Sequence, residues 1–251
     1  MPENTDQENL PLKGQHIVVV VPSYDGRIPI DIVNSLFGLS ALIGANGGEM
    51  SFFSQKNMAI IESARNALLA KIMEYPFVTG VLHLDADIEF EPMDALRLIA
   101  HADGNYDMMV GLYRAKTDTN YLYFVTWEND GEPVLDGEVL PCKRVPMGFA
   151  YVKRKVLDVL WENAKDRPYS IGKAETRMVF ETAYRDGTFI GEDYDFCDKV
   201  RAAGFRIGAL PKINLGHIGT KTFRGSFWDG IEGVKTGQLE MIEGDDARVT
   251  L

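Results

Sequence analysis

Two aspartates, Asp85 and Asp87, are separated by a single residue and directly follow the apolar run at 80–84. The run predicts a buried strand, and open α/β sheets bind ligands at the carboxyl ends of such strands. Side chains two residues apart in an extended chain point the same way, so both carboxylates could hold a hard divalent cation and, through it, a diphosphate. The alternative is a pair of solvated loop acids or a helix cap.

A second acidic cluster, Glu192-Asp193-Tyr194-Asp195, opens a predicted helix. The helix dipole stabilises acidic side chains in that position, so Asp193 could simply cap the helix. The functional interpretation is a general base, a carboxylate that takes the proton of an acceptor hydroxyl as that hydroxyl attacks a sugar carbon.

His217 stands between glycines in the segment Leu215-Gly216-His217-Ile218-Gly219. A lone histidine among apolar residues is usually structural, but at the end of a short strand it could supply a nitrogen ligand to a metal. Lys221 and Arg224 follow it and could contact phosphate. The alternative for these two is an exposed basic loop.

Two further segments occupy positions where a nucleotide could bind. Pro22-Ser23-Tyr24-Asp25-Gly26 follows the first predicted strand, and the first βα turn is a usual nucleotide contact point. The turn lacks G-x-G-x-x-G and the chain lacks a P-loop motif, which disfavours Rossmann dehydrogenases and P-loop NTPases. In Glu62-Ser63-Ala64-Arg65-Asn66, the alternative for Arg65 is a surface pair with Glu62.

Hydrophobic periodicity predicts the elements that position these residues. In the first part of the chain the predicted order of elements is β-α-β-α-β-α-β, which predicts an α/β fold with a mainly parallel sheet flanked by helices. Around Asn129-Asp130-Gly131 the pattern changes to a small antiparallel hairpin region, and residues 165–190 are predicted to be a mobile loop. The predicted helices are 30–43, 59–74, 93–102, 153–163 and 193–203, and the predicted strands are 16–22, 49–54, 80–84, 107–113, 121–127, 132–140, 144–152, 205–210 and 212–216.

The 251 residues carry a net charge of −11, which argues against a protein that coats nucleic acid. The start of the chain has no signal-peptide pattern and no apolar run approaches the ~20 residues of a membrane span. We therefore expect a cytoplasmic protein without stable membrane insertion, with Cys142 and Cys197 as free, buried thiols. We expect a flexible tail at 1–14, a domain at 15–228 and an acidic tail at 229–251.

Taken in order along the chain, these segments resemble the GT-A fold glycosyltransferases, close to the family 2-like group. The resemblance spans roughly residues 16–228. It is carried by VVVVPSYDG, ESARN, LHLDADIEF, GLYRAK, PMGFAYVKR, GEDYDFCDKVRAAGFRIG and LGHIG. Within the domain, the resemblance implies a nucleotide-binding half at 15–113 and an acceptor and catalytic half at 114–228.

The resemblance implies a role for each matching residue. Asp85, Asp87 and His217 would hold Mn²⁺ or Mg²⁺, and Asp193, beside Glu192, would be the catalytic base of an inverting transfer. The donor, with a UDP-sugar favoured, would contact Pro22, Ser23, Tyr24, Asp25, Arg65, Asn66, Asp85, Asp87, Lys221 and Arg224. The acceptor side would hold Arg114, Gly148, Phe149 and Asp195.

Small soluble forms of this kind resemble bacteriophage enzymes, some of which glycosylate hydroxymethylated DNA bases. The acceptor would then be a glycan or a modified nucleobase, and the location would be the host cytoplasm. A basic strip, Lys143, Arg144, Lys153, Arg154 and Lys155, could face such DNA, although a solvated helix start is the more usual explanation. Two other functions stay open: a sugar-phosphate nucleotidyltransferase or pyrophosphorylase, and a non-catalytic sugar-binding protein. A related retaining group leaves the stereochemistry open as well.

Overall fold

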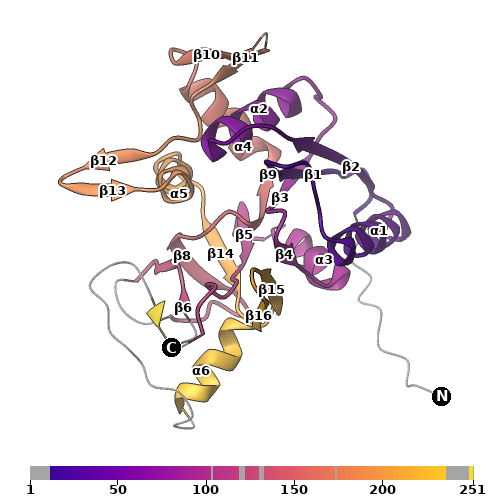
Figure 1. Ribbon diagram of the computed structural model, residues 1–251, viewed down its shortest axis with the longest axis vertical. Helices are drawn as coiled ribbons and strands as arrows, with labels where there is room; N and C mark the ends of the chain where they lie inside the picture. The colour runs from indigo at the N-terminus through magenta and orange to yellow at the C-terminus, as the bar shows by residue number, and fades with distance from the viewer. Residues whose placement is uncertain are drawn as a thin grey trace.

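A mixed sheet of eight strands forms the centre of the computed structural model, which describes residues 12–102, 104–118, 122–129, 133–172, 174–235 and 249–250. In spatial order the strands are β2 (Glu49–Gln55), β1 (His16–Pro22), β3 (Gly80–Leu84), β9 (Phe149–Lys153), β5 (Met108–Gly111), β14 (Ile207–Leu210), β8 (Leu140–Arg144) and β7 (Thr126–Trp127). Strands β9 and β8 run opposite to the other six. The predicted α/β class with a mainly parallel sheet is confirmed (Figure 1).

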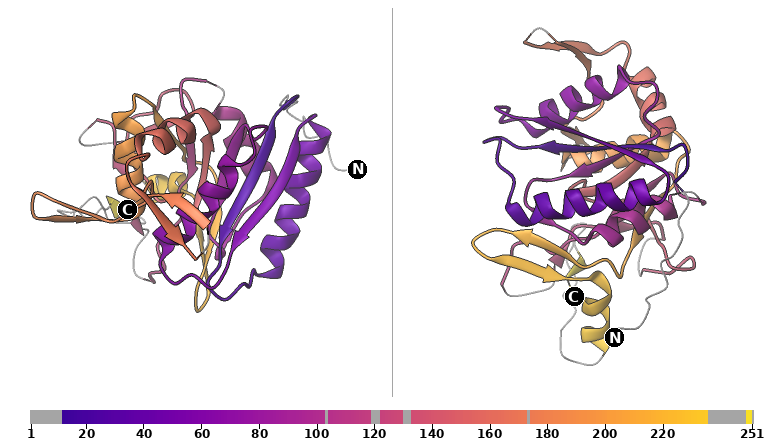
Figure 2. Two further views of the ribbon diagram at one scale, coloured as in Figure 1. Left: turned by 90° about the horizontal axis from the view of Figure 1, so that it is seen from above. Right: turned by 90° about the vertical axis from the view of Figure 1, so that its right-hand side faces the viewer.

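Helices cover both faces of this sheet because its strands are apolar on both sides. In β1, Ile17, Val19 and Val21 pack with α1 (Ile30–Ala45) and α3 (Pro92–His101) in one hydrophobic cluster. Val18 and Val20 pack into a second cluster with α2 (Ile61–Met73), α4 (Arg154–Asn163) and α5 (Glu192–Ala202). The right-hand view of Figure 2 shows α1 and α2 on opposite sides of the strands.

Smaller sheets stand around the central one and carry parts of the site. β4 (Ile88–Glu89), β15 (Leu215–Ile218) and β16 (Thr222–Gly225) form a three-stranded antiparallel sheet beside the end of β3. Two hairpins, β10 (Pro168–Ile171) with β11 (Ala174–Arg177) and β12 (Ala183–Arg185) with β13 (Thr188–Ile190), extend from the body in Figures 1 and 2. β6 (Leu122–Tyr123) pairs with β17 (Val249–Thr250).

Three sequence predictions need correction. The predicted strand at 144–152 is interrupted between β8 and β9, where Pro146 lacks the N–H that a strand ladder needs. The predicted loop at 165–190 contains the two hairpins. Residues 229–235, which the prediction places in the acidic tail, belong to α6 (Phe227–Lys235), anchored by the buried ring of Phe227 against Tyr123 and Trp127.

Other predictions fall partly outside the described residues. These include the turn around Asp130 and most of both predicted tails, so the domain bounds stay a prediction. No helix in the described part of the chain is both long and apolar enough to cross a bilayer. Cys142 and Cys197 are buried and unbridged, as expected.

Candidate active site

The two aspartates at the carboxyl end of β3 line two cavities at once. The backbone N–H of Asp85 donates to the carbonyl of Gly148 at 2.9 Å, which continues the pairing of β3 with β9 and fixes the acids at the sheet edge. Asp85 and Asp87 line a cavity of about 490 Å³ and also a larger one of about 940 Å³. The segment 85–87 is therefore a wall shared by two cavities, each large enough to hold a small-molecule ligand.

The smaller cavity collects the residues of the first βα turn. Pro22, Ser23, Tyr24 and Asp25, all predicted to contact the donor, line it. The turn is held by its own side chains, because Ser23 Oγ donates to the Arg27 carbonyl at 2.8 Å and Asp25 Oδ1 accepts from the Arg27 N–H at 3.0 Å. Tyr24 is 67% exposed, which leaves an aromatic face open to a flat ligand.

Asp193, from the first turn of α5, lines the larger cavity together with Asp85 and Asp87. Burial, and then the neighbouring charge of Glu192, raise the pKa of Asp193 to about 6, although Arg65 partly offsets them. A carboxylate with this pKa is mostly ionised at pH 7 and still accepts protons well, as a general base requires. The cavity is also lined by Tyr113, Phe124, Arg144, Pro146, Gly187, Thr188, Phe189, Ile190, Gly191, Tyr194 and His217.

Asp87 and His217 lie together, as predicted, but a third residue joins them. His217 Nε2 is 3.6 Å from Asp87 Oδ2, and the ammonium of Lys116 is 2.5 Å from the same oxygen. Burial opposes ionisation of Asp87, yet the hydrogen bonds from His217 and Lys116 outweigh it and lower its pKa to about 2. Lys116 was not among the predicted site residues, although it stands two residues after Arg114 in the segment GLYRAK.

The tautomer of His217 is set by its second nitrogen. Nδ1 lies 2.9 Å from the carbonyl oxygen of Arg114, which can only accept, so Nδ1 carries a proton. Nε2 then faces the Asp87 carboxylate and is the ring nitrogen available to a metal ion. One carboxylate and one imidazole nitrogen are suitable ligands for Mn²⁺. Among the described residues no group of three or more His, Cys, Asp or Glu side chains is already arranged as a metal site.

Arg65 lies beneath the acidic residues and does not line either cavity. It is 4% exposed, with Nη2 3.1 Å from Asp85 and Nε 3.9 Å from Glu192. These two acids raise the pKa of Arg65 despite the opposing effect of burial. Arg65 is thus the buried counter-ion of the acids, not a partner of Glu62 on the helix surface.

Gly148 is needed for the close approach of the groups around Asp85. A Cβ at this position would lie 2.5 Å from Tyr113 Oη and 2.7 Å from Asp85 Oδ2. The Gly148 N–H donates to Tyr113 Oη at 3.3 Å. Burial, and then the charge of Asp85, raise the pKa of the Tyr113 hydroxyl well above its usual range, so it remains protonated. Gly148 therefore shapes the site, while Tyr113 is a cavity residue that sequence reasoning missed.

Asn66 was predicted to contact the donor, but its amide is fully used inside the protein. Its Nδ2 donates to Tyr169 Oη at 3.0 Å and to the Phe180 carbonyl at 2.7 Å. Its Oδ1 accepts from the N–H groups of Val179 and Phe180 at 3.2 and 2.8 Å. With 0% exposure, Asn66 fixes the chain before the hairpin β12–β13 and has no atom left for a ligand.

We expect Asn66→Ala to destabilise the fold by about 3 kcal/mol, because it leaves buried backbone groups at 179–180 without partners. The free energy of urea unfolding measures this. Asn163→Ala, at an exposed asparagine on α4, is the control and should change stability little. A stable Asn66→Ala protein with weakened nucleotide-sugar binding would contradict the structural role and restore the donor contact.

Three predicted acceptor residues also have structural roles. Phe149 is 0% exposed and packs against Phe90 in the core. Asp195 is 0% exposed and is ion-paired with Arg185 and, at 2.7 Å, with Lys199. Arg114 contributes its carbonyl to His217 and donates its Nη2 to the Thr117 carbonyl at 3.1 Å.

The two cations after His217 are engaged elsewhere than at either cavity. Lys221 pairs with Asp118, and Arg224 pairs with Glu89 of β4. The first pair connects the turn between β15 and β16 to the segment at 118, and the second joins β16 to β4 within the same sheet. Donor contacts by these two residues therefore require a rearrangement that breaks an ion pair, and they stay a prediction.

The basic strip is divided by the fold. In β9, Lys153 pairs with Gly80 at the start of β3, whereas Phe149 pairs with Leu84 beside the acids. Lys153 and Lys155 bind Asp107, and Arg154 binds Asp158. These three cations thus lie at the opposite ends of the strands from the site and cannot face an acceptor bound there. Of the strip, Arg144 alone is a lining residue of the larger cavity.

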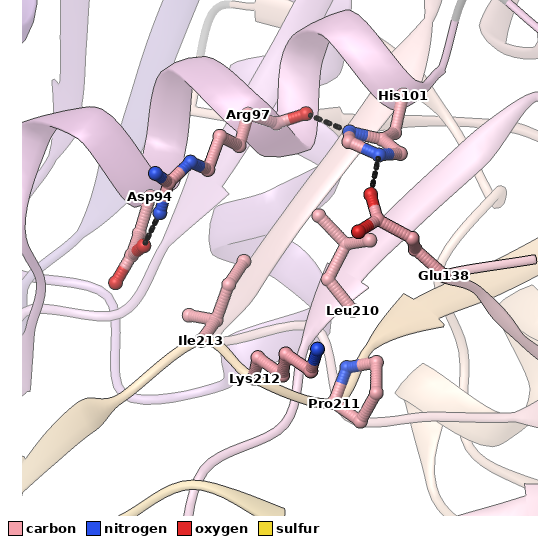
Figure 3. Close-up of a pocket in the computed structure, with 8 residues that line it drawn as sticks. All are labelled: Asp94, Arg97, His101, Glu138, Leu210, Pro211, Lys212 and Ile213. Carbon is pink, nitrogen blue, oxygen red and sulfur yellow. Dashed lines mark hydrogen bonds and ion pairs between the residues drawn. The ribbon is translucent and has the colours of Figure 1, made fainter. Parts of the chain in front are cut away.

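A third cavity, of about 250 Å³, lies between α3 and the segment after β14 (Figure 3). Most of its polar side chains contact one another, since Arg97 pairs with Asp94 at 3.5 Å and His101 lies 3.3 Å from Glu138. None of the residues predicted for the site lines it. The complete lining is Asp94, Arg97, His101, Glu138, Leu210, Pro211, Lys212 and Ile213.

Comparison with known proteins supports the fold. No family model matches the chain, and no curated protein matches it in sequence. Among solved structures, A197 from STIV is similar with a TM-score of 0.54 and 18% identity over 86% of this chain and 92% of that one.

Two other solved structures are more distant. A glycosyltransferase involved in the glycosylation of the major capsid of PBCV-1 has a TM-score of 0.33 and 11% identity over 62% of this chain and 70% of that one. The inositol-1-phosphate CTP transferase from T. maritima has a TM-score of 0.44 and 11% identity over 81% and 89%. The similarity to A197 from STIV establishes that this chain shares its fold with a viral protein.

Proposed function

We propose that the chain is a metal-dependent glycosyltransferase that moves a sugar from a nucleotide-diphospho-sugar, with a UDP-sugar favoured, to an acceptor hydroxyl. One observation carries the proposal: Asp193 lines the same cavity as Asp85 and Asp87, and these two aspartates also line a second cavity that collects the first βα turn. The donor nucleotide would occupy the smaller cavity, and the acceptor the larger one.

The raised pKa of Asp193 favours sugar transfer over nucleotidyl transfer. An alcohol is un-ionised at neutral pH and becomes a good nucleophile only as a base removes its proton. A sugar phosphate, the nucleophile of a nucleotidyltransferase, is already ionised and needs no base. A carboxyl group with a pKa of about 6 inside the cavity therefore suits a hydroxyl acceptor.

Asp87 and His217 would hold the Mn²⁺ or Mg²⁺, with Asp85 beside them. The metal supplies charge neutralisation for the leaving diphosphate. The chain's own groups do the rest: Asp193 takes the acceptor proton, Arg65 lowers the pKa of Asp193 and is the counter-ion of Asp85 and Glu192, and Tyr113 lines the cavity as a protonated hydroxyl. When the acceptor hydroxyl attacks the anomeric carbon from the side opposite the leaving diphosphate, the anomeric centre is inverted.

We expect Asp87→Ala to abolish metal-dependent donor binding, because it removes the carboxylate on which His217 and Lys116 converge. The measurement is thermal unfolding with UDP-, GDP-, CMP- and dTDP-sugars, each with Mn²⁺ and with EDTA. A donor at 100 times its Kd adds about 2.7 kcal/mol to the stability of the wild-type protein.

The matched control is Asp158→Ala, which removes an acid that pairs with Arg154 on α4. It should leave the donor shift intact. A shift of equal size in Asp87→Ala, or in EDTA, would refute the metal role. Pyrophosphate production from a nucleoside triphosphate and a sugar phosphate, without sugar transfer, would favour the nucleotidyltransferase instead.

A further inference from the structure

Two phenylalanines that line the larger cavity are exposed to solvent and are not part of the hydrophobic core. Phe189 of β13 is 73% exposed and Phe124, between β6 and β7, is 38% exposed, and both line the cavity that contains Asp193. Tyr184 of β12 is paired across the hairpin with Phe189 and is 74% exposed. Residues directly opposite in an antiparallel pair share a face, so Tyr184 and Phe189 form one exposed aromatic surface.

The hairpin that carries this surface is fixed to the catalytic helix. Arg185 of β12 is ion-paired with Asp195 and, at 3.2 Å, with Asp198, both on α5. Asp193 stands in the first turn of the same helix. The buried carboxylate of Asp195 thus ties the aromatic surface and the general base to one rigid element, which keeps their separation constant.

The charges around the cavity decide what these rings can bind. Its acids are Asp85, Asp87 and Asp193, and its lining cation, Arg144, is ion-paired with Asp198 at 2.8 Å. The cations Lys153, Arg154 and Lys155 lie at the opposite sheet edge. A nucleic acid would need several unpaired Lys or Arg side chains to neutralise its phosphates. An acidic cavity with exposed rings instead suits a neutral ligand that has an apolar face.

We infer that the acceptor is a neutral pyranoside, a sugar residue of an uncharged glycan, which lays its C–H face on Phe189 and presents a hydroxyl to Asp193. Phe124 contributes a second ring to the same space, and Tyr184 extends the surface for the next sugar of a longer chain. This inference rests on the proposed function and names its acceptor class.

The test separates acceptor binding from donor binding. Saturation-transfer NMR is recorded on the wild-type protein with methyl glycosides of glucose, galactose, mannose and N-acetylglucosamine, in the presence of the donor nucleotide found by thermal unfolding. Methyl glucuronide serves as the charged analogue. A duplex oligonucleotide with 5-hydroxymethylcytosine is titrated separately by fluorescence anisotropy.

We expect at least one neutral glycoside to bind, the glucuronide to bind more weakly, and Phe189→Ala to lower the glycoside affinity about tenfold with donor binding unchanged. Phe37→Ala, which removes an equally exposed ring on α1, is the matched control and should bind like the wild type. Tyr184→Ala gives a second variant on the same surface.

The inference would be overturned by wild-type protein that binds its donor but none of the glycosides, or by glycoside affinity that is the same in Phe189→Ala and wild type. Salt-sensitive binding of the oligonucleotide in preference to the glycosides would also overturn it, in favour of a DNA acceptor. A wild-type protein that binds no nucleotide sugar at all would instead count against the proposed function.

Discussion

Asp193→Asn should lose sugar transfer by a factor of about 10²–10⁴, the usual contribution of a general base, and should at the same time become more stable at neutral pH. The asparagine keeps the shape of the side chain and an oxygen for the Tyr194 N–H, which Asp193 Oδ1 accepts at 2.8 Å. It removes a charge that burial and Glu192 disfavour. Loss of activity with a gain in stability would distinguish a functional charge from a helix cap.

The sign of the pH dependence follows from the raised pKa. The folded protein binds the Asp193 proton with a pKa of about 6, whereas an unfolded aspartate has about 3.9, so the folded form is favoured below pH 4 and loses this advantage as pH rises through 6. Two pKa units correspond to almost 3 kcal/mol, and partial solvation reduces this to about 2 kcal/mol.

Urea unfolding of wild type and Asp193→Asn at pH 4 and pH 7.5 measures this dependence. The variant should be more stable at pH 7.5 and nearly equal at pH 4. In the wild type, kcat should fall on the acid side with a pKa near 6. Asp158→Asn is the control and should show no gain at either pH. Full activity of Asp193→Asn would remove it from the mechanism.

The second large effect is expected for Arg65→Met, which should destabilise the protein by about 3 kcal/mol. Breaking a buried ion pair leaves Asp85 and Glu192 without a counter-ion, and their side chains keep only 30% and 18% of their exposure to water. Because Arg65 also lowers the pKa of Asp193, the variant's acid limb of kcat should move to higher pH. Denaturant unfolding and the pH profile measure the two effects.

Arg97→Met is the matched control, since Arg97 pairs with Asp94 on the surface of α3 with 48% exposure. Its cost should stay under about 1 kcal/mol, as for most surface ion pairs. An Arg65→Met protein as stable as this control would show that Asp85 and Glu192 are adequately solvated without Arg65. An unchanged acid limb would show that Arg65 does not act on Asp193.

Much of the fold follows from local sequence, and the exceptions have clear physical causes. Strand β3 was predicted with the bounds it has, because Gly80–Leu84 is buried on both faces and therefore continuously apolar. The hairpin β12–β13 was missed because its outward side chains are exposed and its strands have only three residues each, so no alternation is visible.

The site was predictable where it depends on strand ends and not where it depends on contacts between distant segments. Asp85 and Asp87 could be placed at a sheet edge from the preceding strand, and Asp193 at a helix start. Lys116 reaches Asp87 across 29 positions in the chain, and Arg65 reaches Asp85 across 20. No periodicity encodes such contacts, so Arg65 was assigned to the donor although it is buried.

If donor and acceptor occupy the two cavities as proposed, the segment 85–87 that both cavities share also couples the two binding equilibria. A ligand in either cavity that favours one arrangement of Asp85 and Asp87 thereby alters the affinity of the other cavity. The coupling is reciprocal, so the factor by which donor changes acceptor affinity equals the factor by which acceptor changes donor affinity. The order in which the two substrates bind would therefore be set by the segment 85–87. Cooperativity between the substrates requires no movement of domains.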